Sequence, residues 1–98
     1  MYIKIHEACR KIIAICDSNL LGKRFEQGNL QLEVNEAFYG GEKKTEQEIE
    51  EMVRDFITDD ASFNLVGEKT IKIALKLGLI DEEGIIYVQG IPHAIVLI

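Results

Sequence analysis

The segment Lys11–Cys16 constrains the fold of this 98-residue chain most strongly, because it is almost continuously apolar. Such a run is typical of a strand that is buried in the middle of a sheet. The segment Tyr2–His6 alternates between polar and apolar residues, which is typical of a half-buried strand. We expect the two segments to form a hairpin with Cys9 in its turn and Cys16 at its far end, so that both cysteines are free thiols.

Three further segments have the pattern of strands. They are expected at Leu30–Val34, Ile85–Gln89 and Ala94–Ile98. The segment Gly90–His93 would join the last two as a four-residue hairpin loop.

Two segments have the pattern of helices. The first begins at a capping box, Thr45–Glu48, and is expected to reach about Ile57 with one apolar stripe that packs on the sheet. The second is expected over about Asn64–Leu77, with Gly78 as its C-terminal cap. We therefore predict a single α+β domain over residues 1–98, in which an antiparallel or mixed sheet of about five strands carries two main helices mainly on one face.

Composition and charge exclude several classes of protein. The hydrophobic content of 47% is that of a globular protein. No apolar run reaches the ~18 residues that span a bilayer, and the N-terminus lacks the features of a signal peptide, so we expect a cytoplasmic protein without a membrane partner. The net charge of −6 argues against a general binder of phosphate backbones. Residues 42–60 carry eight acidic and three basic residues, which leaves the remainder nearly balanced.

Three Gly-containing polar segments interrupt the apolar chain: Phe38–Glu42, Asn64–Lys69 and Gly90–His93. None contains a known nucleotide-binding loop pattern. In the first, an exposed aromatic ring could stack on a base, and the amides of the Gly pair could bind an anion. The candidate binding residues there are Tyr39, Gly40, Gly41 and Glu42. The alternative is a turn that leads into a helix, and in either case we expect Tyr39 to be partly exposed and Phe38 to pack inward.

His93 is the second candidate, either as a general base or ligand or as a surface histidine in a turn. The spacing of His6, Cys9, Cys16 and His93 matches no zinc motif, so we predict no metal site and no cofactor. Asp17 beside Cys16 would raise the pKa of the thiol, which favours a buried structural cysteine over a nucleophile. No catalytic residue is predicted.

A line of lysines is the third candidate. On the second predicted helix, Lys69, Lys72 and Lys76 fall within about 60° of one another. They could contact phosphates, or they could form the solvated edge of an amphipathic helix.

Several segments in order resemble a family: Cys16-Asp17, Leu20–Lys23, Phe38–Glu42, Asn64–Lys69 and Gly90–Ala94. Together they are similar to a small archaeal family known only as domain of unknown function four-two-four. The resemblance covers essentially the whole chain and implies an archaeal, cytosolic, single-domain protein. It implies no activity, substrate or catalytic residue.

Three hypotheses for function follow. The first is a non-enzymatic binding or adaptor module with RNA or a ribosome-associated protein as its partner. The second is a small-ligand-binding or enzymatic domain that uses Tyr39, Glu42, Lys69 and His93. The third is a structural homodimer subunit that buries the last strand or the second helix. Clustering of the four residues around one pocket would favour the second, and a large apolar face left open would favour the third.

Overall fold

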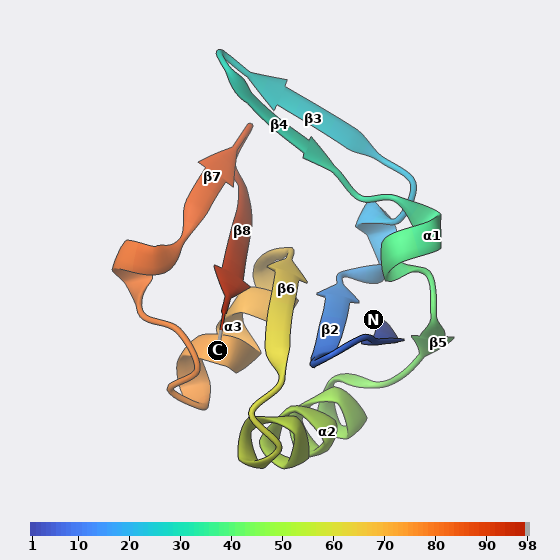
Figure 1. The fold of residues 1–98 in the computed structure, drawn as a ribbon. Coiled ribbons are helices and arrows are strands. Elements are labelled where there is room, and N and C mark those ends of the chain that lie inside the picture. Colours follow the sequence, from blue (N-terminus) through green and yellow to red (C-terminus); the bar gives the residue numbers. More distant parts are fainter. Residues whose placement is uncertain (98) are drawn as a thin grey trace.

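Six strands form one mixed sheet in a computed structural model, which describes residues 1–97 (Figure 1). Strands β2 and β6 run parallel, and the other neighbouring pairs are antiparallel. In spatial order the strands are β5 (Glu42–Lys43), β1 (Tyr2–Glu7), β2 (Lys11–Cys16), β6 (Ser62–Val66), β8 (Ile91–Val96) and β7 (Ile86–Val88). The predicted α+β class is confirmed, and so is the hairpin of β1 and β2, in which Tyr2 lies opposite Cys16.

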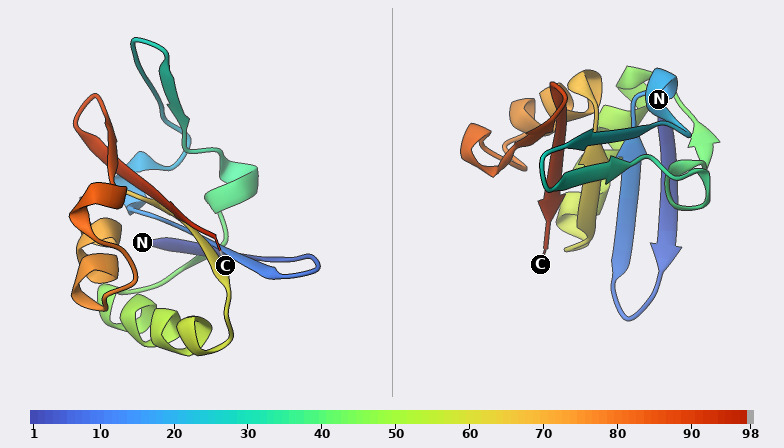
Figure 2. Two further views of the ribbon diagram at one scale, coloured as in Figure 1. Left: turned by 60° about the vertical axis from the view of Figure 1, so that its left-hand side comes forward. Right: turned by 90° about the horizontal axis from the view of Figure 1, so that it is seen from above.

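Helices α2 (Glu46–Thr58) and α3 (Glu68–Lys76) cover one face of this sheet (Figure 2). The capping box of α2 is present, with Thr45 Oγ1 accepting from the amide of Glu48 at 3.1 Å and Glu48 Oε1 accepting from the amide of Thr45 at 3.0 Å. The buried side chains between the helices and the sheet are apolar, and they include Ile13, Ile15, Ile49, Val53, Phe63, Leu65, Ile71 and Ala94. No described helix is long and apolar enough to cross a bilayer.

The other face is covered only in part. The turn η1 (Ser18–Leu20), a two-stranded sheet of β3 (Arg24–Gln27) and β4 (Leu30–Glu33), and the short helix α1 (Glu36–Tyr39) lie over it (Figures 1 and 2). A second, smaller core lies beneath them, formed by Ala14, Cys16, Leu20, Leu32, Val34, Tyr39, Val66 and Val88. The predicted strand at Leu30–Val34 is thus β4, outside the main sheet.

The prediction that a helix begins near Asn64 is wrong, because Asn64 lies in β6 and α3 begins at Glu68. Gly67 separates the two elements with a φ of 110°, and a Cβ there would overlap the carboxylate of Asp17. Asp17 occupies that space because it accepts hydrogen bonds from the amides of Lys69 (3.0 Å) and Thr70 (2.9 Å). The start of α3 is therefore capped by a residue about 50 positions earlier in the chain.

The predicted four-residue loop Gly90–His93 is also wrong. The connection is Gln89-Gly90, with φ values of 52° and 77°, as a two-residue hairpin turn between twisted strands requires. The last strand, β8, consequently begins at Ile91, and His93 lies within it. A short turn, η2 (Glu82–Gly84), precedes β7. The final residue of the predicted strand, Ile98, lies outside the described residues.

Candidate functional site

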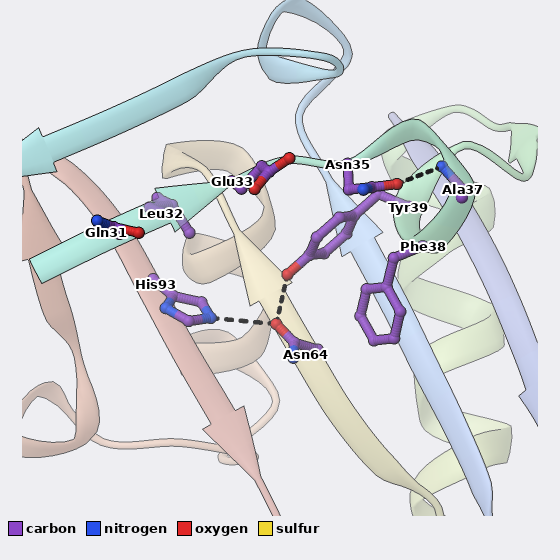
Figure 3. Close-up of a pocket in the computed structure, with 9 residues that line it drawn as sticks. All are labelled: Gln31, Leu32, Glu33, Asn35, Ala37, Phe38, Tyr39, Asn64 and His93. Carbon is purple, nitrogen blue, oxygen red and sulfur yellow. Dashed lines mark hydrogen bonds between the residues drawn. The ribbon is translucent and has the colours of Figure 1, made fainter.

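A cavity of about 510 Å³ lies between the partly covered face of the sheet and the segment that runs from β4 into α1 (Figure 3). Its size falls within the range of about 300–1,000 Å³ that is common for small-molecule sites. Its walls come from β4 and α1, which are consecutive in sequence, and from β6 and β8, which lie much further along the chain. The lining residues are Gln31, Leu32, Glu33, Asn35, Ala37, Phe38, Tyr39, Asn64 and His93.

Asn64 is the central polar residue of this cavity. Its Oδ1 accepts a hydrogen bond from the hydroxyl of Tyr39 at 2.5 Å, and the Nε2 of His93 lies 3.1 Å from the same oxygen (Figure 3). Tyr39 comes from α1, Asn64 from β6 and His93 from β8. We name these three residues the Asn64 cluster.

Local structure holds Tyr39 in place. Asn35 caps the start of α1 by accepting from the amide of Ala37 at 2.7 Å. At the other end of the helix, a Cβ on Gly41 would overlap the backbone of Ile3 in β1, so this glycine permits the close approach of the two segments. The ring of Tyr39 is therefore directed onto the sheet, where only 4% of the residue is exposed.

The protonation states of the cluster follow from burial. Burial, and to a lesser extent the neighbouring Cys16, raises the pKa of Tyr39, which keeps the hydroxyl protonated as a donor. Burial also lowers the pKa of His93 below its ordinary value of 6.5, which favours the neutral ring at pH 7. Because Asn64 Oδ1 can only accept, His93 must carry its proton on Nε2, and its Nδ1 is then an acceptor.

Two polar atoms of the cluster are available to a ligand. Among residues 1–97, no hydrogen bond uses the amide nitrogen of Asn64 or the Nδ1 of His93. No buried side-chain nitrogen or oxygen in the same part of the chain lacks a partner, so these two atoms must be accessible. They present one donor on Asn64 and one acceptor on the side of the His93 ring that faces away from Asn64 (Figure 3), so a polar ligand can bond to either atom.

Phe38 forms an aromatic wall of the cavity. Its ring stacks on His6, with a centroid separation of 4.6 Å and an interplanar angle of 16°, and it meets Tyr39 edge-on at 5.0 Å. The Nε2 of His6 donates to the carbonyl of Phe38 at 2.8 Å, which fixes the backbone as well. This support leaves Phe38 half-buried and rigid enough to serve as a surface for a planar ligand.

The lining carries one charged side chain, and it is acidic. Glu33 is the single ionised side chain among the nine residues that line the cavity, and it is exposed at the rim. No lysine or arginine is among those nine. The lining therefore offers no cationic partner to a phosphate or a carboxylate.

The expectation that Tyr39 would be partly exposed is wrong, since Tyr39 is buried. Phe38, which was expected to pack inward, packs against the second core but stays half-buried. We expected a turn at the Gly pair, but these residues end a helical turn. Adjacent side chains on a helix diverge by about 100°, so only one of the two rings can face the sheet. His93 was expected in a turn and instead lies half-buried in a strand beside the cavity.

The structure brings together only part of the predicted binding set. Tyr39 and His93 meet at the cavity, whereas Gly40 and Gly41 follow α1 and Glu42 lies exposed in β5, paired with Lys44 at 3.2 Å. The other candidates, Lys69, Lys72 and Lys76, are exposed on α3, which lies on the opposite face of the sheet.

Sequence reasoning missed Asn64 and the amide-bearing residues of the rim, Gln31 and Asn35. A signal for Asn64 was present, because an asparagine stands in the middle of the otherwise strand-like segment Ser62–Val66. Asparagine is depleted in strands, so its presence in this one indicates a role other than strand formation.

Cys16 is not a reactive group in this structure. Burial, with a further contribution from Asp17, raises the pKa of its thiol to about 11. Cys9 is exposed in the turn between β1 and β2, and both thiols are free. Within residues 1–97, no three His, Cys, Asp or Glu side chains form a group that could hold a metal ion.

Comparison with known proteins establishes the family and the fold. A family model described as "Protein of unknown function (DUF424)" matches residues 6–98. No curated protein matches the chain. The fold is similar to that in a crystal structure of an uncharacterized conserved protein from Methanopyrus kandleri, with a TM-score of 0.84 and 24% identity over 97% of this chain and 88% of that chain. At this identity the likeness establishes the fold alone.

Proposed function

This chain belongs to the DUF424 family of proteins of unknown function, and we propose that it binds a small uncharged molecule in the cavity beside Asn64. The observation that carries the proposal is the Asn64 cluster. Two separate elements direct their side chains to one amide oxygen, which fixes the orientation of the amide nitrogen of Asn64 as a donor and of the Nδ1 of His93 as an acceptor. A site that holds its polar groups in place before binding loses less entropy when the ligand arrives.

The ligand class follows from the lining. A carbonyl oxygen of a neutral ligand would accept from the amide nitrogen of Asn64, and a separate donor group would bond to the Nδ1 of His93. A planar ring next to that group would lie against Phe38. The absence of cations among the nine lining residues favours a neutral ligand over a phosphorylated or carboxylated one.

Binding is supported better than catalysis. The hydroxyl of Tyr39 is held protonated, and the thiol of Cys16 is buried with a raised pKa. Neither is a nucleophile under these conditions. His93 is left as the one group of the cluster able to accept a proton, and a single base without a nucleophile or an electrophilic partner does not make a catalytic set.

Nucleic-acid binding through α3 has weaker support. Lys76 is paired with Glu50 of α2 at 2.9 Å, and Glu50 also contacts Arg54 at 3.3 Å. The acidic helix α2 thus lies beside the lysines and reduces their attraction for phosphates. The homodimer hypothesis stays a prediction. Ile95 in β8 and Leu97 just after it are exposed, and a second copy of the chain could cover them.

Titration with three benzene derivatives of similar size tests the proposed function. Benzamide is neutral and carries a carbonyl acceptor for the amide of Asn64, benzoate is an anion, and benzylamine is a cation. In ¹H–¹⁵N NMR spectra, benzamide should shift the side-chain amide signal of Asn64 and the ring signals of His93, and benzoate should leave them unchanged. Signals from Lys72 on the opposite face are the internal control. Equal binding of all three compounds, or of none, would overturn the proposal.

A further inference from the structure

A second cavity of about 470 Å³ adjoins the first on the same face of the sheet. Phe38 and Asn64 line both cavities. The register of the strands explains the continuity: Asn64 lies opposite Ile95 of β8, and Ser62, two residues along β6, lies opposite Ile12 of β2. These side chains point to one face of the sheet, so the second cavity continues the first along the strands.

The second cavity differs from the first in its chemistry. Its lining is mainly apolar, and it is bounded at the far end by the turn that joins β1 and β2. The lining residues are Ala8, Cys9, Arg10, Ile12, Phe38, Ser62, Phe63, Asn64, Ile95 and Leu97. Arg10 and Ser62 already interact with other groups.

Apolar surface remains uncovered there. Ile95 is 54% exposed and Leu97 is 82% exposed, although both are large aliphatic residues. Covering such side chains with an apolar group is favourable in water. An occupant of the first cavity that extends past Phe38 would provide that cover without a second protein.

Resting on the proposed function, we infer that the ligand is amphipathic: a neutral amide-type head binds the Asn64 cluster, and an apolar arm passes Phe38 into the second cavity. The two cavities share walls, and each supplies what the other lacks. The first cavity orients a polar group of the ligand, and the second adds affinity only by burying apolar surface. A buried methylene contributes about fourfold in affinity under full burial, so a butyl arm should strengthen binding at least tenfold even when it is covered in part.

The test compares benzamide with its 3-butyl and 4-butyl derivatives, by NMR titration of the whole chain. The better derivative should bind at least tenfold more tightly than benzamide and should shift the methyl signals of Ile12, Ile95 and Leu97. It should also slow the reaction of Cys9 with a thiol reagent, because Cys9 lines the second cavity and Cys16 is buried. Benzamide itself should leave that reaction rate unchanged.

Two matched variants test whether the tighter binding of the butyl derivative comes from the second cavity. Ile95→Ser should remove most of the advantage of the butyl arm and leave benzamide binding unchanged. Ile5→Ser is the control, because Ile5 is also an exposed strand isoleucine (41%) but lies opposite Ile13, on the face that the helices cover. If it is instead Ile5→Ser that removes the gain, or if neither variant does, the arm does not lie in the second cavity.

The outcomes separate this inference from the proposed function. If benzamide binds and the butyl arm adds nothing, the cavity beside Asn64 is a ligand site and the amphipathic ligand is wrong. If benzamide does not bind, the proposed function fails first. Sedimentation at a chain concentration of about 100 µM gives the remaining result: a dimer that Ile95→Ser dissociates would assign the apolar surface to a second copy of the chain and overturn the inference.

Discussion

The two faces of the central sheet are built from the same strands and differ in almost everything else. Phe63 and Asn64 are neighbours in β6, yet Phe63 is buried in the apolar core under α2 and α3, whereas Asn64 lines a cavity (Figure 3). The helix-covered face is made by local amphipathic patterns. The other face is made by pieces that are distant in sequence, and it keeps polar groups and open volume. The difference indicates that the first face stabilises the fold and the second carries the site.

The largest expected effect is on the helix-covered face. Phe63 is 1% exposed, so Phe63→Ala should lower the free energy of unfolding by about 3–5 kcal/mol through lost burial and the cavity left behind. Urea denaturation followed by circular dichroism would measure the loss. A loss below about 1 kcal/mol would mean that this core is not the main source of stability.

The second-largest expected effect is at Asp17, which links the sheet to the start of α3. Asp17→Ala removes the acceptor for the amides of Lys69 and Thr70 and for the hydroxyl of Thr70, so we expect a loss of roughly 2 kcal/mol in unfolding free energy. The exposed neighbour Asn19 supplies the control, Asn19→Ala, which should change little. Similar losses for both variants would show that the cap has no special part in holding α3.

A smaller effect is expected within the Asn64 cluster. Tyr39→Phe removes one hydrogen bond and leaves Asn64 Oδ1 bonded to His93, so it should lower stability by only about 1 kcal/mol. Tyr87→Phe, at an exposed tyrosine, should be neutral. A loss of 3 kcal/mol or more for Tyr39→Phe would place this cluster among the stabilising elements and blur the contrast between the two faces.

The smallest effect is the pH dependence that His93 contributes. Its folded-state pKa lies below the unfolded value of 6.5, so the unfolded chain binds the proton more readily as the pH falls. The contribution of His93 to stability is therefore present above pH 6.5 and is lost as the pH drops from there through the folded-state pKa. Unfolding curves between pH 7.5 and pH 5 should show this decline in wild type and a weaker one in His93→Gln. Parallel curves for the two proteins would contradict the burial of a neutral ring.

The sequence was sufficient for the parts of the fold that local patterns determine. The hairpin of β1 and β2 and the capping box at Thr45 could be predicted because the relevant residues are neighbours. Strand β6 could not be predicted, since Asn64 and Gly67 in sequence look like the start of a helix. The role of Gly67 depends on Asp17, which is far away in the chain.

The candidate site could be predicted only in fragments. Tyr39 and His93 stood out because they lie in glycine-containing segments, but 25 residues separate Tyr39 from Asn64, and 29 separate Asn64 from His93. Their meeting depends on the strand order, in which β6 and β8 are neighbours, and on α1 folding back over the sheet. Neither the strand order nor the position of α1 can be inferred from the spacing of these residues in the sequence.

One variant tests the central claim, that Asn64 serves binding on the open face rather than stability. Asn64→Leu alone would leave the buried hydroxyl of Tyr39 without its acceptor, so the variant combines it with Tyr39→Phe. Because both partners of the hydrogen bond are then apolar, this double variant should leave the free energy of unfolding within about 1 kcal/mol of wild type. The same variant should abolish the binding of benzamide. A folded variant with unchanged stability and no binding would support the account. A loss of several kcal/mol, with benzamide bound by neither protein, would contradict it and make the Asn64 cluster a structural network.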